Sequence, residues 1–102
     1  MDTDVLITHG PPMGILDWVL PNHELVGCEE LLPAVYKIKP MLHLFGHIHE
    51  AYGIHEENGI KFVNASICTV RYKPSNKPFV FDFDPITGNL SRAHDWTYAT
   101  PD

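Results

Sequence analysis

Two short apolar runs, residues 4–8 (DVLIT) and 41–45 (MLHLF), each stop at a corner that contains glycine and histidine. The first run is rich in β-branched residues and shows no clear alternation, which predicts a central strand buried on both faces. A helical pattern lies between the two runs, so we expect neighbouring parallel strands joined by a right-handed crossover. This strand–loop–helix–strand unit places the chain in the α/β class.

The connection between the two runs divides into a loop and a helix. Residues 9–24 contain several glycines and prolines and predict a long loop, a kind of segment that often carries function. Residues 26–39 predict a helix, with apolar residues near helical spacing at Val26, Leu31, Leu32, Val35 and Ile38. Pro33 either kinks this helix or marks its first turn, and Pro40 ends it.

After residue 51 the pattern changes to short strands. Residues 52–57 and 60–64 flank Asn58 and Gly59, a pair that favours the type I′ turn of a β-hairpin. Further strands are predicted at residues 67–72, 79–83 and 90–96. The sequence shows no repeat and no clear linker, so residues 1–102 are expected to form a single domain, an α/β unit followed by antiparallel strands.

The composition argues against several functional classes. The formal net charge of −6 disfavours non-specific binding to nucleic acid or to anionic membranes. No run approaches the roughly 18 apolar residues of a membrane span, and the N-terminus lacks the basic region of a signal peptide. Cys28 and Cys68 lie far apart and predict free thiols in a reducing compartment. We therefore expect a cytoplasmic protein with no membrane partner and no sequence-specific nucleic-acid partner.

Histidines follow both strands of the predicted crossover. His9 comes directly after the first run, and His47 and His49 follow the second. Ligands gather at the carboxyl ends of strands in an open α/β sheet, and histidine is the commonest metal ligand near neutral pH. Gly10 and Gly46 permit sharp turns beside these histidines. The pattern indicates a metal site, with capping or hydrogen-bonding histidines as the alternative.

Three segments, DVLITHGPP, LFGHIHEAYG and VNAS, together resemble the C-terminal half of the calcineurin-like metallophosphoesterases, in particular their metallophosphoesterase-domain-containing subgroup. The resemblance covers roughly residues 4–83 of the chain. It implies part of an α/β/β/α sandwich that hydrolyses phosphate esters. It also implies two divalent metal ions, Mn, Fe or Zn, in a complete site.

The resemblance implies roles for the three histidines as well. His9 and His47 would bind one metal ion, and His49 would bind the other. Of the family's other motifs, Asp-x-His and Gly-Asp are absent from this sequence, and an Asn-His pair occurs only in the predicted loop, at Asn22 and His23, outside the setting of the family motif. Those motifs supply the bridging aspartate, further metal ligands and a histidine that assists the leaving group, so no catalytic residue is assigned in this chain.

A count of the available metal ligands also indicates an incomplete site, without reference to the family. Two divalent ions close together need carboxylates to offset their charge, whereas this edge offers three neutral imidazoles. Asp17 and Glu50 are the nearest candidate carboxylates for this edge, and Asp17 is expected to be a turn or cap residue. The chain alone is therefore expected to hold one ion or none.

Three further polar residues are candidates for this edge. Glu50 follows His49 directly and could hydrogen-bond a ligand histidine, with a solvated or structural role as the alternative. Asn64 lies in VNAS and could approach the site and its substrate, or could cap its own backbone. His43 lies inside the second run and is expected to be a core or hydrogen-bonding residue rather than a ligand.

Two functions from different classes fit the sequence. The first is a metal-dependent hydrolase of phosphate esters, a phosphodiesterase or phosphomonoesterase, in which a metal-bound hydroxide attacks phosphorus and this chain supplies only the C-terminal metal-binding histidines. The alternative is a truncated, non-catalytic protein that binds at most one metal weakly and interacts through exposed strands. Uncovered sheet edges predict self-association or pairing with the missing half of the domain. A purely structural domain with incidental histidines is a third interpretation.

Overall fold

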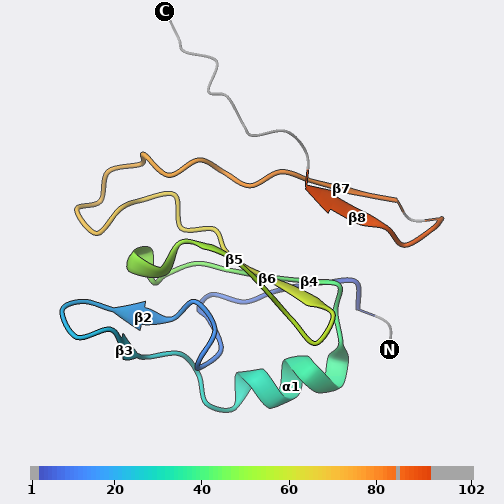
Figure 1. Cartoon of the computed structure of the whole chain (residues 1–102), viewed down its shortest axis with the longest axis horizontal. Coiled ribbons are helices and arrows are strands. Elements are labelled where there is room, and N and C mark those ends of the chain that lie inside the picture. The colour runs from blue at the N-terminus through green and yellow to red at the C-terminus, as the bar shows by residue number, and fades with distance from the viewer. Residues whose placement is uncertain (1–2, 85, 93–102) are drawn as a thin grey trace, which may run out of the picture.

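The computed structural model describes residues 3–84 and 86–92. Within these residues, one α-helix and a four-stranded sheet form the main unit, and two-stranded sheets lie beside it (Figure 1). None of the helices in this part of the chain has the length and apolar character needed to cross a membrane. The elements in chain order are β1 (Val5–Ile7), β2 (Trp18–Val19), β3 (Glu24–Leu25), α1 (Leu31–Ile38), β4 (Leu42–Phe45), the 3-10 helix η1 (His49–Ala51), β5 (Gly53–Glu57), β6 (Ile60–Asn64), β7 (Phe81–Phe83) and β8 (Leu90–Arg92).

The four-stranded sheet has the order β1-β4-β6-β5. β1 and β4 are parallel, with Val5 opposite Leu42 and Ile7 opposite Leu44, and α1 lies between these strands in the chain. β4 is also parallel to β6, and β6 is antiparallel to β5. The predicted α/β class and the predicted parallel pairing of the two apolar runs are therefore confirmed.

Other elements lie on both faces of the sheet, although Val5 and Ile7 of β1 stay exposed. α1 lies on one face, and the segment that contains β7 and β8 lies on the other (Figure 1). On the second face, the Lys61 ammonium lies 5.4 Å from the centre of the Phe81 ring. The core on the α1 side consists of buried apolar residues from the first loop, the helix and the sheet: Ile15, Val35, Phe45, Ile60 and Phe62.

α1 begins at Leu31, later than the start predicted at residue 26. The preceding residues are engaged in backbone contacts with the first loop, where Cys28 N donates to Pro11 O at 3.0 Å. Cys28 forms an isolated β-bridge with Pro12, so the chain here is paired with the first loop rather than coiled into a helix. Pro33 lies in that first turn, where its missing N–H has no helical partner to lose.

The predicted hairpin is confirmed in β5 and β6. Asn58 and Gly59 connect the strands with φ angles of 52° and 75°, the left-handed region that a type I′ turn requires. Asparagine tolerates this region better than most residues with a Cβ, and glycine enters it without steric cost. The local sequence at the turn therefore determines the register of the two strands.

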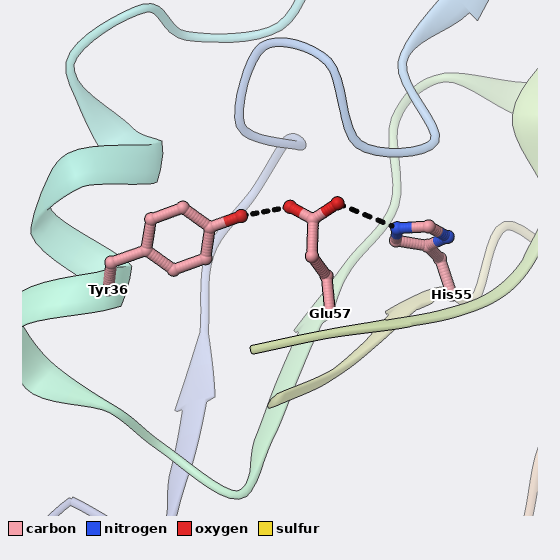
Figure 2. A network of polar contacts seen from close by, with 3 residues as sticks. All are labelled: Tyr36, His55 and Glu57. Atoms are coloured by element: carbon pink, nitrogen blue, oxygen red, sulfur yellow. Dashed lines mark hydrogen bonds and ion pairs between the residues drawn. The ribbon is translucent and has the colours of Figure 1, made fainter. Parts of the chain in front are cut away.

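A polar network ties this hairpin to α1 (Figure 2). Tyr36 on α1 donates its hydroxyl hydrogen to Glu57 on β5, and His55 Nε2 lies 3.5 Å from Glu57 Oε1. The hydrogen bond from Tyr36 lowers the pKa of the Glu57 carboxyl, and the same bond raises the pKa of Tyr36. Because Glu57 and His55 are exposed, the network orients the hairpin more than it stabilises the fold.

β1 is an edge strand of the described sheet, so the expectation of a central strand buried on both faces is wrong. Its only strand partner among the described residues is β4. Val5 is 41% exposed and Ile7 is 73% exposed. An apolar run predicts a strand, but its place in the sheet depends on neighbours that are distant in sequence.

The strand predicted at residues 67–72 does not form. Tyr72 N instead donates to Thr69 O at 2.8 Å, which closes this stretch into a turn, and Tyr72 has a φ of 61°. The strand predicted at 79–83 is confirmed in the shorter β7. β8 forms the start of the strand predicted at 90–96, whose last residues lie outside the described part of the chain.

Candidate metal centre

The carboxyl ends of β1 and β4 meet at one edge of the sheet because these strands are parallel neighbours. Backbone pairing continues past both strands: Thr8 N donates to Leu44 O at 3.0 Å, and Gly46 N donates to His9 O at 3.1 Å. The two corners that follow the strands are thereby joined. His9 and His47 lie together there, with ring centres 4.7 Å apart and ring planes tilted by 42°.

His47 has an unusual backbone conformation. Its φ of 70° lies in the left-handed region, which costs a residue with a Cβ about 1–2 kcal/mol. Gly10 lies against its ring, since a Cβ added to Gly10 would be 4.0 Å from His47 Cδ2. His9 and His47 are both exposed. Two adjacent, solvent-accessible imidazoles could bind a metal ion or an anion.

His49 begins η1 and does not join the pair formed by His9 and His47. Its Nδ1 lies 3.1 Å from Thr69 O, and its ring meets Tyr72 edge-on at 5.2 Å. A carbonyl oxygen only accepts hydrogen bonds, so in the neutral ring Nδ1 carries the hydrogen and Nε2 keeps a lone pair. His47 and His49 both border a hollow of about 390 Å³.

Asn64 is fully buried and binds backbone groups near the histidines. Its Nδ2 donates to Leu16 O at 3.1 Å and to Ile48 O at 2.8 Å, and its Oδ1 accepts from Ser66 N at 3.1 Å. Both hydrogens of the Asn64 side-chain amide are therefore engaged in hydrogen bonds. Asn64 fixes the backbone between the two histidines that follow β4.

The two candidate carboxylates, Asp17 and Glu50, bind backbone N–H groups. Glu50 Oε2 accepts from Leu20 N at 3.1 Å. Asp17 is 1% exposed, and its Oδ2 accepts from Gly14 N at 2.9 Å and from Gly27 N at 2.8 Å. Asp17 therefore closes the first loop, as predicted for a turn residue.

His43 is buried in the sheet close to this edge. Its exposed fraction is 0%, and burial lowers the pKa of its imidazole from 6.5 to about 4. The folded chain therefore holds a neutral ring at neutral pH. The predicted role as a core and hydrogen-bonding residue is confirmed, because His43 Nε2 lies 2.9 Å from Thr8 Oγ1.

The sequence pattern does not identify Thr8 as part of this edge. Its hydroxyl contacts both Gly10 and His43. Strand propensity alone accounts for a threonine at the end of a β-branched run, so the pattern gives no sign of these contacts. Only its position directly before His9 could have drawn attention to it.

One stretch of 80 residues is shared with known proteins, although no family model matches the chain. Metallophosphoesterase domain-containing protein 1 of Homo sapiens is 55% identical over 78% of this chain and 24% of its own length. The protein of the same name from Mus musculus gives the same values. UPF0046 protein T07D4.2 of Caenorhabditis elegans is 44% identical over 78% of this chain and 20% of its own length. Over this stretch, the chain is homologous to metallophosphoesterase domain-containing proteins.

The metallophosphoesterase resemblance inferred from the sequence is confirmed by these identities. The chain spans about a quarter of the length of the human and mouse relatives. The aligned stretch therefore corresponds to one part of a longer sequence in those relatives.

The described residues of this chain do not by themselves complete a centre with two metal ions. Residues 3–84 and 86–92 contain no group of three or more His, Cys, Asp or Glu side chains placed to hold a metal ion. Protein sites for transition metals usually have three or four protein ligands. His9 and His47 offer two nitrogen ligands, which is part of the coordination shell of one ion. That the chain alone holds one ion or none stays a prediction.

Acid should destabilise the chain through His43. The pKa of His43 is lower in the folded chain than in the unfolded chain, because the buried ring is held neutral. The contribution of the neutral ring to the free energy of unfolding is therefore complete above pH 6.5 and is lost as the pH falls toward 4. We expect a loss on the order of 1–3 kcal/mol at pH 4. Urea denaturation between pH 7 and pH 4 measures it, with His43→Gln as the control. The same pH dependence in both proteins would contradict the assignment.

His47→Gly should be more stable than His47→Ala by about 1 kcal/mol. Both substitutions remove the imidazole, but only glycine adopts a φ of 70° without a Cβ clash. The midpoint of urea unfolding measures the difference. The matched pair His9→Gly and His9→Ala should show no gain for glycine, because His9 is not among the residues with positive φ. If the glycine variant is more stable than the alanine variant at both positions, the difference does not come from the φ angle of His47.

Proposed function

We propose that this chain supplies metal-binding histidines to a hydrolase of phosphate esters, a phosphodiesterase or a phosphomonoesterase. The observation that carries the proposal is the pair His9 and His47, whose ring centres lie 4.7 Å apart at one edge of the sheet. Metal–nitrogen bonds are about 2.0–2.1 Å long, so both rings can approach a common ion. The name of the human and mouse relatives, metallophosphoesterase domain-containing protein 1, supports the same class of reaction.

The backbone of His47 also supports a functional role. Residues with a Cβ in sparsely populated conformations persist where the surrounding structure holds them, and they cluster at functional sites. His47 has a φ of 70° and stays exposed, so burial in the core does not explain its presence there. A histidine kept in this conformation at a sheet edge is consistent with selection for its imidazole.

We assign His49 to a second metal ion. Its Nδ1 binds Thr69 O, which leaves Nε2 as the ligand atom, and metal-binding histidines commonly have such a backbone partner on the other nitrogen. Asn64 would support this edge by fixing the Ile48 carbonyl, and Glu50 by binding the backbone of the first loop. These residues orient the site rather than contact phosphorus.

A complete centre holds two divalent ions, Mn, Fe or Zn, which offset phosphate charge and supply a hydroxide near neutral pH. The described residues of this chain account for nitrogen ligands only. Carboxylate ligands and the leaving-group acid would come from outside them. The chain's own contribution is therefore to hold imidazoles at fixed positions, and no proton transfer is assigned to its side chains.

A second function, non-catalytic interaction, is favoured by the open edge of β1. Ile7 is 73% exposed, and β1 pairs only with β4 within the described residues. Open apolar edge strands tend to pair with further strands. Under this alternative the chain binds at most one metal weakly, and self-association or the missing part of the domain covers the edge.

Zn²⁺ binding tests the assigned histidines. Affinity for the 102-residue chain should fall about tenfold or more in His9→Ala and in His47→Ala, because each variant loses one of two adjacent ligands. Isothermal titration calorimetry measures it. His23→Ala is the control, since His23 packs on Trp18 beside the turn between β2 and β3. Equal affinity in all three variants would contradict the proposal.

A further inference from the structure

A chain of polar contacts leads from the sheet to the turn that carries His9. His43 on β4 places its Nε2 2.9 Å from Thr8 Oγ1. The hydroxyl of Thr8 in turn donates to the Gly10 carbonyl at 2.8 Å. The contacts therefore reach the residues on both sides of His9 in the sequence.

The direction of each hydrogen bond in this chain follows from hydrogen counting. The hydroxyl of Thr8 has one hydrogen, and the Gly10 carbonyl takes it because a carbonyl only accepts. Thr8 Oγ1 must therefore accept its second bond, so His43 donates through Nε2–H. His43 Nδ1 is buried and has no hydrogen-bond partner among residues 3–84 and 86–92. Of the two neutral tautomers of His43, only the one with the hydrogen on Nε2 can donate to Thr8 Oγ1.

His43 is held rigidly. Its ring meets Phe45 and Phe62 edge-on, with ring centres 5.0 Å and 5.6 Å away. Its strand is paired on both sides, with Leu6 and Phe62 as the opposite residues. A ring packed at 0% exposure between two paired strands has little freedom to rotate. It therefore fixes the position of the Thr8 hydroxyl.

The far end of the contact chain lies at the pair of exposed histidines. Gly10 accepts the bond from Thr8 and lies against His47, whose Cδ2 would be 4.0 Å from a Cβ on Gly10. Gly46 N donates to His9 O at 3.1 Å and so joins the two corners through the backbone. The backbone bond sets the corners side by side, and the hydroxyl bond closes the turn between Thr8 and Gly10.

We propose that His43 is a positioning residue for His9 and acts through the hydroxyl of Thr8. The inference rests on the proposed metal-binding function, because the contacts align the His9 and His47 rings. His43 touches no ion and no substrate in this role. Loss of the Thr8 hydroxyl leaves the backbone bonds at the corner in place, so the fold is retained while the His9 ring loses its fixed direction.

Thr8→Val tests the positioning role, because valine keeps the volume and branching of threonine and removes the hydroxyl. Thr8→Ser is the matched control, since it restores the hydroxyl. Without metal, wild type should show a nuclear Overhauser effect between the rings of His9 and His47. The effect should be lost in Thr8→Val and recovered in Thr8→Ser, with amide spectra that report a retained fold. An unchanged effect in Thr8→Val would overturn the proposal.

Zn²⁺ affinity provides a second readout. It should fall about tenfold in Thr8→Val and stay within about twofold of wild type in Thr8→Ser. His43→Phe keeps a ring and removes the donor, so it should match Thr8→Val, and the double variant should be no weaker than either single variant. Additive losses would overturn the proposed relay. If the wild-type chain alone binds no Zn²⁺, the nuclear Overhauser effect between the two rings decides the positioning role, independently of the proposed function.

Discussion

Parallel pairing of β1 with β4 is the interaction on which the rest of the structure depends. The pairing brings the ends of two distant segments to one edge, and the bonds from Thr8 to Leu44 and from Gly46 to His9 extend it beyond the strands. His9 and His47 are neighbours for this reason. A shift of one residue in the register of β4 would turn its buried side chains to the opposite face and separate the two corners.

The surrounding elements keep this edge in shape mainly through side-chain bonds to the backbone. Asp17 closes the first loop at Gly27, where a Cβ would lie 2.4 Å from Pro12 O, so the loop and the segment before α1 approach more closely than any other residue type would permit. Asn64 holds the backbone between the histidines that follow β4. Buried polar side chains thus shape the loops, and exposed imidazoles are left accessible to a ligand.

The parts of the fold that the sequence predicts correctly are specified by neighbouring residues. The Asn-Gly turn determines the hairpin, and two apolar runs around a helix predict the parallel pair. The edge position of β1 and the late start of α1 depend on contacts between distant residues, which local patterns do not contain. The turn after β6 is closed by a local bond, from Tyr72 N to Thr69 O, where the residue types predicted a strand. The candidate site also has a part that the sequence predicts and a part that it does not. Strand-end reasoning places His9 near His47, whereas the bond from His49 to Thr69 cannot be inferred from a His-x-His spacing.

Hydrolysis of bis(p-nitrophenyl) phosphate by the purified 102-residue chain in Mn²⁺ tests most directly whether these histidines contribute to a site without completing it. His47→Ala is the control. We expect no turnover above the His47→Ala background, because the described residues provide no group of three ligands for an ion. Turnover that requires both Mn²⁺ and His47 would contradict this view and would show that the chain assembles a working centre on its own.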